Sequence, residues 1–395
     1  MKLNENIPNM IILGSTGSVG EQAVDVAKKF GVGVDAISAH RNVTRVEEQA
    51  RAFSVKACAM SDRAAAKDLR ERLKDTFVKV YEGTEGICEM ISETNTDNPN
   101  GQIVENSIVG EAGLLPTLAT LNAGKRLALA NKESLVVGGE EVMRTAREKG
   151  IEILPVDSEH CAIFQCLRAG KREEIKRILL TASGGPFFGY SKEQLKTASL
   201  ESALAHPTWS MGSKITVDSA TLMNKGFEVI EAIHLFGVKP EQVEVVVHRE
   251  SILHSAVEYV DNSVIAQMSV PDMRHCVQYA LTHPHRGMAA QKQLDLFSIG
   301  KLTFQKPDTD TFLLLANAFE AIRLGGAVPA VLNAANEEAV AAFLDKKIGF
   351  YDICEIVCYV LDAMRSSGNT HRLEDILFCA KQARELTRER ILLTR

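Results

Sequence analysis

The sequence lacks several features that define whole classes of protein. No apolar run approaches the roughly 18 residues of a membrane-spanning helix, so we expect no integral membrane protein and no membrane partner. Residues 1–6 do not lead into an apolar stretch that ends in a cleavage site of small residues, so we expect no secretory signal. The eight cysteines include no Cys-x-x-Cys pair, which argues against zinc-ribbon and thioredoxin-like proteins. We therefore predict reduced thiols and a cytoplasmic location.

Basic charge and hydrolase motifs are also missing. Lys plus Arg is 45 against 51 for Asp plus Glu, a net charge of −6 without a basic block, so we expect no nucleic-acid partner. Neither Gly-x-Ser-x-Gly nor His-Glu-x-x-His occurs. What is present is an ordinary globular composition, with 45% hydrophobic and 24% charged residues. At about 150 residues per domain, 395 residues predict two or three domains.

Strand and helix patterns alternate along the first third of the chain. We expect strands at 10–13, 34–39, 107–109, 127–130 and 151–156, and helices at 19–30 and 114–123. Such alternation predicts an α/β domain with a Rossmann-like, doubly wound parallel sheet.

The rest of the chain changes character twice. Mixed patterns, including strands at 178–180, 243–248, 255–260 and 264–268 with a hairpin turn at 261–263 and a helix after 218–221, predict an α+β domain. Long amphipathic patterns at 312–324, 330–344, 353–364 and 376–393 predict a helical bundle. We place a nucleotide-binding domain at 1–156, a catalytic domain at 157–282, a linker at 283–308 and the helical domain at 309–395.

A glycine cluster follows the first predicted strand and opens the first predicted helix. Gly14, Gly17 and Gly20 are spaced GxxGxxG rather than GxGxxG. Glycines at a helix start let the backbone approach a pyrophosphate, so the context predicts a dinucleotide site. Asp35 would favour NAD, but it lies at the start of the second strand, whereas Arg41 at its end favours the 2′-phosphate of NADP. An ordinary surface arginine is the alternative for Arg41.

Two further segments carry candidate chemistry. Asp157 and Glu159 follow a predicted strand, and strand spacing would point both carboxylates the same way, toward Mg²⁺ or Mn²⁺. A third ligand is needed, and spacing does not identify it. The segment 214–228 has hydroxyls, an amide and lysines near a predicted helix start, and these groups suit a phosphate. The alternative is a capped helix with a few exposed polar residues, which would show the same pattern.

Ten motifs in order then resemble one family, 1-deoxy-D-xylulose 5-phosphate reductoisomerase. They are GSTGSVG at 14–20, NVTR at 42–45, AGLLPTLA at 112–119, LANKESLV at 129–136, LPVDSEH at 154–160, SGGPF at 183–187, HPTWSMG at 206–212, KITVDSATLMNKGFE at 214–228, PDMR at 271–274 and LNAANEEAVAAFL at 332–344. They span nearly the whole chain, and VDSEH with DSATLMNKG is highly specific.

The resemblance implies an oxidoreductase and isomerase of the non-mevalonate isoprenoid pathway. With NADPH and Mg²⁺ or Mn²⁺ it would convert a phosphorylated sugar, 1-deoxy-D-xylulose 5-phosphate, into 2-C-methyl-D-erythritol 4-phosphate. The carbon skeleton would rearrange by retro-aldol cleavage and re-addition to an aldehyde, which NADPH reduces. The resemblance also implies a homodimer.

The same resemblance assigns residues to roles. The metal ligands would be Asp157, Glu159 and Glu228, which with Lys132 would be catalytic. The substrate would contact Lys132, Ser158, Glu159, Ser183, His206, Trp209, Ser219, Asn224, Lys225, Glu228 and His254, with Trp209 on a mobile flap at 206–213. NADPH would contact Gly14, Thr16, Gly17, Ser18, Val19, His40, Arg41, Asn42, Asn131, Glu133 and Gly212.

The sequence departs from the family pattern at three places. His40 replaces a glycine, which affects contact with the 2′-phosphate, and Glu111 replaces a small residue. Arg249 and Glu250 replace the usual Pro-Gln of His-Pro-Gln-Ser, near the expected subunit contact.

Two other functions are weighed against this one. A semialdehyde or homoserine-type dehydrogenase would share the cofactor domain, and the semialdehyde type would need a nucleophilic cysteine, for which only Cys161 and Cys166 are near the expected cleft. An NADP-sensing regulator would have lost a metal carboxylate, Lys132 or Lys225, and all of these are present.

Overall fold

The structure is a computed structural model that describes residues 7–98, 100–287 and 289–394. The segment 1–6, from which we predict no secretory signal, lies outside the described residues. The chain forms two compact units, one of residues 1–134, 141–161 and 272–293 and one of residues 135–140, 162–271 and 294–395. No helix in the described ranges has the length and apolar character to cross a membrane.

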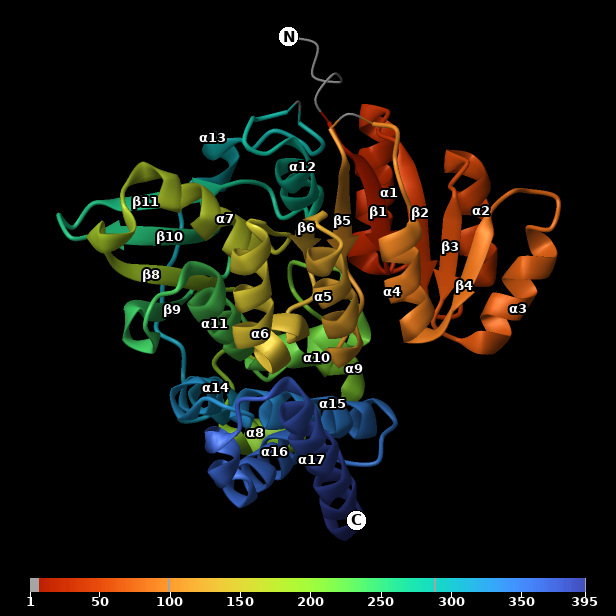
Figure 1. Cartoon of the computed structure of the whole chain (residues 1–395). Helices are drawn as coiled ribbons and strands as arrows, with labels where there is room; N and C mark the ends of the chain where they lie inside the picture. Colours follow the sequence, from red (N-terminus) through yellow and green to blue (C-terminus); the bar gives the residue numbers. More distant parts are fainter. Residues whose placement is uncertain (1–6, 99, 288, 395) are drawn as a thin grey trace. The chain divides into compact units, whose positions relative to one another are not determined.

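The first unit is built on a seven-stranded parallel sheet with the order β4-β3-β2-β1-β5-β6-β7 (Figure 1). Its strands are β1 (Asn9–Leu13), β2 (Val34–Ala39), β3 (Ala57–Met60), β4 (Lys79–Glu82), β5 (Gln102–Asn106), β6 (Arg126–Leu129) and β7 (Ile153–Pro155). Its helices are α1 (Ser18–Phe30), α2 (Val43–Phe53), α3 (Arg63–Arg72), α4 (Gly83–Glu93), α5 (Leu114–Asn122) and α12 (Arg274–Thr282). Helices α6 (Glu133–Lys149) and α7 (Ser158–Cys166) contribute to both units.

The strand order reverses between β1 and β5, and such a switch point is where open α/β sheets bind ligands. Alternating residues divide each strand between two faces. Ile11 and Leu13 of β1 pack with Ile87 and Met90 of α4 in one buried cluster. The doubly wound domain predicted from the alternating patterns is therefore confirmed.

The second unit combines a four-stranded mixed sheet with helices. The sheet order is β11-β10-β8-β9, with β8 parallel to β9 and the other pairs antiparallel. Its strands are β8 (Ile175–Ala182), β9 (Val243–Val247), β10 (Leu253–Tyr259) and β11 (Val264–Met268). Its helices are α8 (Lys192–Lys196), α9 (Leu200–Ala203), α10 (Ser213–Ala220), α11 (Met223–Phe236), α13 (Leu296–Ile299), α14 (Leu313–Leu324), α15 (Val328–Leu344), α16 (Phe350–Ala363) and α17 (Leu373–Thr394).

Helix α15 is the centre of the helical part of this unit. Most of its residues are buried, and α16 and α17, drawn in blue in Figure 1, both pack against it. This matches the four long helices predicted from amphipathic patterns. The predicted hairpin is also present, with Asn262 at a φ of 66° in the turn between β10 and β11.

One local prediction is wrong. The segment 107–109 is a loop, because the strand in this part of the chain is β5, which ends at Asn106. The helix predicted after residues 218–221 is present as α11, while residues 218–220 themselves form the end of α10. Leu222, at a φ of 61°, separates α10 from α11.

Candidate active site

The loop after β1 fits a closely approaching diphosphate. A Cβ on Gly14, whose φ is +77°, would lie 2.8 Å from the carbonyl oxygen of Ser107, and one on Gly20 would lie 2.2 Å from that of Gly14. Gly17, the N-cap residue of α1, makes no side-chain cap hydrogen bond to the first N–H groups of the helix, and such groups can bind an anion. The order of strand, glycine loop and helix is the one that the residue pattern predicted.

A buried glutamine holds this loop and was not found from the sequence. Gln49 of α2 accepts a hydrogen bond from Ser15 Oγ at 2.7 Å and donates to the Ser15 carbonyl oxygen at 3.0 Å. Nothing in the spacing of Gln49 signals this role, because the contact joins a loop to a helix 34 residues away.

The end of β2 carries the residues proposed for the 2′-phosphate. The side chain of Arg41 is 71% exposed and pairs with Asp62 at 2.9 Å. His40 Nδ1 lies 2.8 Å from Ser61 Oγ, and Asn42 caps α2 by accepting from the N–H of Arg45 at 3.2 Å.

Asp35 serves the fold instead. It lies at the start of β2, is buried, and accepts from Asn9 and from Gln102 at 3.1 and 2.6 Å. The glycine loop follows the carboxyl end of β1, whereas Asp35 lies near the amino end of β2. Asp35 is therefore at the opposite edge of the parallel sheet and is not placed to hold a ribose.

Asn131 and Glu133 follow β6 and are both buried. Asn131 Nδ2 donates to the carbonyl oxygens of Ile108 and Gly110 at 2.7 and 2.9 Å and to Glu133 Oε2 at 3.0 Å. The Asn131 amide therefore joins the loop after β5 to the loop after β6, the two strands next to the switch point.

Asp157 caps helix α7 and is tightly held. Its Oδ1 accepts the N–H groups of Glu159 and His160, each at 3.0 Å, and lies 2.8 Å from His160 Nδ1. Its Oδ2 accepts from Lys132 Nζ at 2.5 Å. Ser158 Oγ donates to Glu159 Oε2 at 2.6 Å. The predicted reason for pairing the two carboxylates was wrong, since they lie at a helix start and not on a strand.

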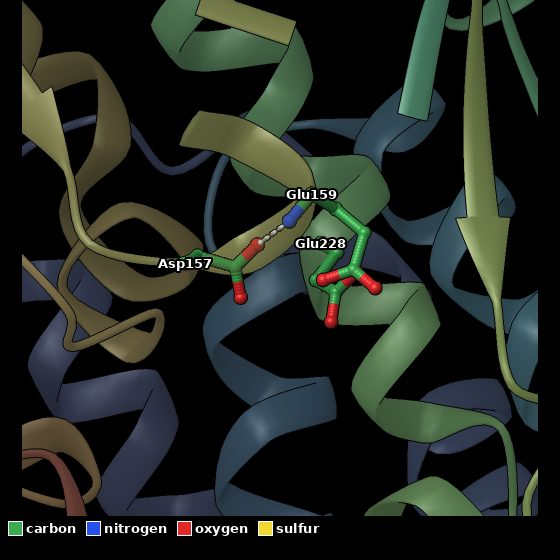
Figure 2. Close-up of side chains that lie close together, drawn as sticks. All are labelled: Asp157, Glu159 and Glu228. Atoms are coloured by element: carbon green, nitrogen blue, oxygen red, sulfur yellow. Dashed lines mark hydrogen bonds between the residues drawn. The ribbon is translucent and has the colours of Figure 1, made fainter. Parts of the chain in front are cut away.

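Glu228 lies in α11 and is almost fully buried. Asn224 donates to its Oε1 at 2.5 Å, and Lys225 donates to its Oε2. One carboxylate oxygen from each of Asp157, Glu159 and Glu228 falls within 4.8 Å of the others (Figure 2). Three oxygen donors at this spacing fit a hard divalent cation such as Mg²⁺ or Mn²⁺.

Ser183 and His206 meet in the second unit. His206 Nδ1 accepts the backbone N–H groups of Thr208 and Trp209 at 3.2 and 3.0 Å, which assigns the ring proton to Nε2, 3.0 Å from Ser183 Oγ. Burial, helped by the positive charge of Arg249, lowers the pKa of His206 to about 4. The ring is therefore neutral near pH 7 and donates to Ser183.

The Ser183 hydroxyl is left with a hydrogen to give. Its oxygen accepts from His206 and from the N–H of Gly185 at 3.2 Å. A Cβ on Gly185, whose φ is +66°, would lie 2.6 Å from the carbonyl oxygen of Ser219, so this loop lies directly against the end of α10. The loop that carries Ser183 is thus next to the helix end that carries Ser219.

The segment between α9 and α10 carries the predicted flap. It has no helix or strand, and Thr208 and Ser210 are exposed. The half-buried Trp209 ring lies 6.3 Å from the ring of His254, which is buried and whose Nε2 lies 3.1 Å from the Ser269 carbonyl oxygen.

The predicted residues thus fall into local groups. Gly14 to Val19, His40 to Asn42 and the Asn131 to Glu133 segment follow β1, β2 and β6 in the first unit. Ser183, His206, Trp209 and His254 are connected in the second unit, which also holds Gly212, the exposed N-cap residue of α10. A glycine-rich dinucleotide loop with a carboxylate cluster is typical of a metal-using, nucleotide-dependent oxidoreductase.

Comparison with known proteins agrees over the whole chain. Residues 10–139 match the 1-deoxy-D-xylulose 5-phosphate reductoisomerase family model, and residues 153–236 and 268–386 match models of C-terminal domains of that enzyme. The 1-deoxy-D-xylulose 5-phosphate reductoisomerase of Acetivibrio thermocellus is 49% identical over 378 residues, 96% of this chain and 98% of that protein. That of Agathobacter rectalis is 50% identical over 347 residues, 88% of this chain and 90% of that protein.

Solved structures extend the comparison. A reductoisomerase from Zymomonas mobilis in complex with NADPH has a TM-score of 0.88 at 41% identity and covers 97% of this chain and 99% of that one. A DOX-P reductoisomerase in complex with NADPH, fosmidomycin and magnesium has a TM-score of 0.92 at 39% identity and covers 98% and 99%. The chain belongs to the 1-deoxy-D-xylulose 5-phosphate reductoisomerase family.

Family membership decides against the two alternatives. Cys161 and Cys166 are 1% and 3% exposed, so neither offers the accessible nucleophile that a semialdehyde dehydrogenase needs. Membership in a family of enzymes also decides against the NADP-sensing regulator.

Proposed function

We propose that this protein converts 1-deoxy-D-xylulose 5-phosphate into 2-C-methyl-D-erythritol 4-phosphate, using NADPH and a divalent cation, in isoprenoid biosynthesis. The observation that carries the proposal is the cluster of Asp157, Glu159 and Glu228 in a chain of this family. When bound, NADPH supplies the hydride and the cation polarises the substrate oxygens. Mg²⁺ and Mn²⁺ both suit three carboxylates.

The metal ligands would be Asp157, Glu159 and Glu228. Two lysines already oppose this negative charge, because Lys132 pairs with Asp157 and Lys225 pairs with Glu228. Lys132 would then be free to turn toward a substrate oxygen once the cation takes over the carboxylate. Its ammonium would stabilise negative charge that develops on that oxygen.

The cofactor would lie along the sheet edge after β1, β2 and β6. Gly14, Thr16, Gly17, Ser18 and Val19 would hold the diphosphate, because the start of α1 attracts an anion. His40, Arg41 and Asn42 would meet the 2′-phosphate. Asn131, Glu133 and Gly212 would border the nicotinamide half.

The substrate phosphate would bind at the end of α10. Ser183 would donate its free hydroxyl hydrogen, because its oxygen already accepts two hydrogen bonds. His206, Ser219, Asn224 and Lys225 would complete the phosphate site. The other end of the substrate would contact Ser158, Glu159 and Glu228.

The segment 206–213 would close over the substrate and exclude water. Trp209 would cover the bound sugar, and its ring packs near the ring of His254 in this structure. Exclusion of water strengthens each charge interaction in the site.

We also propose that the chain is divided into the functional domains predicted from the sequence, with the catalytic domain at 157–282. All eight cysteines are free thiols, which supports a reducing compartment, the cytoplasm. A homodimer is the proposed assembly, and sedimentation would test it.

The test is an assay of nicotinamide absorbance with NADPH, 1-deoxy-D-xylulose 5-phosphate and Mg²⁺ or Mn²⁺. Metal-dependent oxidation that forms 2-C-methyl-D-erythritol 4-phosphate and stops with a chelator is expected. A protein that binds NADPH yet gives no oxidation with either metal would refute the proposal.

A further inference from the structure

Arg249 lies beside the loop that carries Ser183. Strands β8 and β9 are parallel with Ala182 opposite Val247, so the residues after them lie at the same sheet edge. Arg249 Nη1 donates to the carbonyl oxygen of Gly185 at 2.9 Å and lies 3.4 Å from that of Ser183. Its guanidinium carbon lies 5.0 Å from the centre of the Phe188 ring.

The Arg249 charge has no counterion within the part of the chain that the structure describes. Its neighbour Glu250 is engaged elsewhere, with Thr303 Oγ1 at 2.8 Å and His248 Nδ1 at 3.0 Å. The charge reaches His206, whose pKa it helps to lower. The surroundings of Ser183 and His206 therefore carry uncompensated positive charge, which favours an anion.

The loop needs an anchor of this kind. Gly184 and Gly185 both have positive φ values, 78° and 66°. Because the peptide group is planar and trans, a Ser183 carbonyl that faces Arg249 turns the N–H of Gly184 the opposite way. Movement of the loop would also move the Ser183 hydroxyl, which depends on the N–H of Gly185.

We propose that Arg249 is a positioning residue for the substrate phosphate: it fixes the 183–185 loop through two carbonyl oxygens and adds an unpaired positive charge beside Ser183 and His206. The identity of the substrate rests on the proposed function, whereas the anion site does not. A proline, the usual family residue at this position, has no side-chain donor and no charge.

Three variants separate charge from support. Arg249→Met removes the Nη1 donor and the charge, Arg249→Lys keeps a charged donor without the planar guanidinium, and Arg372→Gln is a control at a side chain that is 79% exposed. The measurements are KM for 1-deoxy-D-xylulose 5-phosphate, KM for NADPH, kcat, thermal midpoint, and the dissociation constant of inorganic phosphate by ³¹P NMR titration.

We expect Arg249→Met to raise the substrate KM and the phosphate dissociation constant by about tenfold, with kcat changed less than about threefold. Arg249→Lys should recover part of the loss, and Arg372→Gln should change neither. Unchanged phosphate binding in Arg249→Met would overturn the proposal. The proposal would also be overturned if kcat, NADPH affinity and thermal midpoint all fell, and fell to the same extent in Arg249→Met and Arg249→Lys. That result would indicate structural support alone. If the unaltered protein turned over no 1-deoxy-D-xylulose 5-phosphate, the proposed function would fail, and phosphate titration would still decide the role of Arg249.

Discussion

Asp157 accepts the backbone N–H of Glu159 at 3.0 Å, so one of the proposed metal ligands fixes the backbone that carries another (Figure 2). The same carboxylate caps α7 through the N–H of His160. A substitution of Asp157 would therefore remove a helix cap, worth about 1 kcal/mol, together with a ligand. Glu228 is the cleaner position at which to test the cation, because its carboxylate caps no helix.

We expect Glu228→Gln to lower turnover by roughly 10²–10⁴-fold while NADPH affinity stays within about twofold, because the amide keeps the shape and loses the charge. Steady-state kinetics over a Mg²⁺ series and NADPH fluorescence titration measure the two effects. Glu241→Gln, at a side chain that is 65% exposed, is the control. Unaltered turnover in Glu228→Gln would rule out this residue as a ligand.

Gly20→Ala should weaken NADPH binding sharply. Its Cβ would lie 2.2 Å from the carbonyl oxygen of Gly14, so the glycine loop or the start of α1 must move. Gly31→Ala is the matched change at the other end of α1, where no atom lies within 4 Å and the cost is the left-handed backbone, about 1 kcal/mol. NADPH titration should give a loss above about tenfold for Gly20→Ala and little change for Gly31→Ala. Equal affinities in the two variants would contradict the contact.

The sequence predicts the fold wherever an element is long and its period is clear. The strand at 34–39 and the helix at 19–30 agree with β2 and α1 to within one residue. Short strands are found less regularly: β3 and β4, with four residues each, were not predicted, whereas β6 and β7, which are no longer, were. The break at Leu222 follows from a backbone conformation that leucine rarely adopts, and no local pattern signals it.

The candidate site divides in the same way. The glycine loop and the Asp157–Glu159 pair are adjacent in sequence, so local motifs find them. Glu228, 69 residues beyond Glu159, came only through family resemblance. Gln49 and Arg249 act through contacts with distant loops, and neither residue type nor spacing marks them.

Arg41→Gln should raise the KM for NADPH by about tenfold and leave the KM for NADH nearly unchanged, because the removed charge would face only the 2′-phosphate. Kinetics with both cofactors measure the ratio. Arg41 also pairs with Asp62, so Asp62→Asn is a useful second variant that frees the guanidinium while keeping a cap for α3. Equal catalytic efficiencies with NADH and NADPH in the unaltered protein would overturn the role of Arg41.

Glu105 of β5 gives the fold a pH dependence. It is fully buried, its Oε1 has no hydrogen-bond partner, and burial raises its pKa to about 8, an effect that the hydrogen bond from Ser107 Oγ opposes. The folded chain therefore keeps this carboxyl protonated while the unfolded chain ionises it above its ordinary pKa of 4.5. The folded state binds more protons between these two values, so the free energy of unfolding falls as the pH rises through that window.

Glu105→Gln should remove that dependence. Between pH 5 and pH 8.5 the variant should gain stability relative to the unaltered protein, by up to roughly 5 kcal/mol for the full shift. Thermal or urea unfolding at a series of pH values measures the difference. Glu85→Gln, at an exposed position of α4, should follow the unaltered protein throughout. A stability difference between Glu105→Gln and the unaltered protein that is constant with pH would mean that Glu105 does not change its protonation on unfolding.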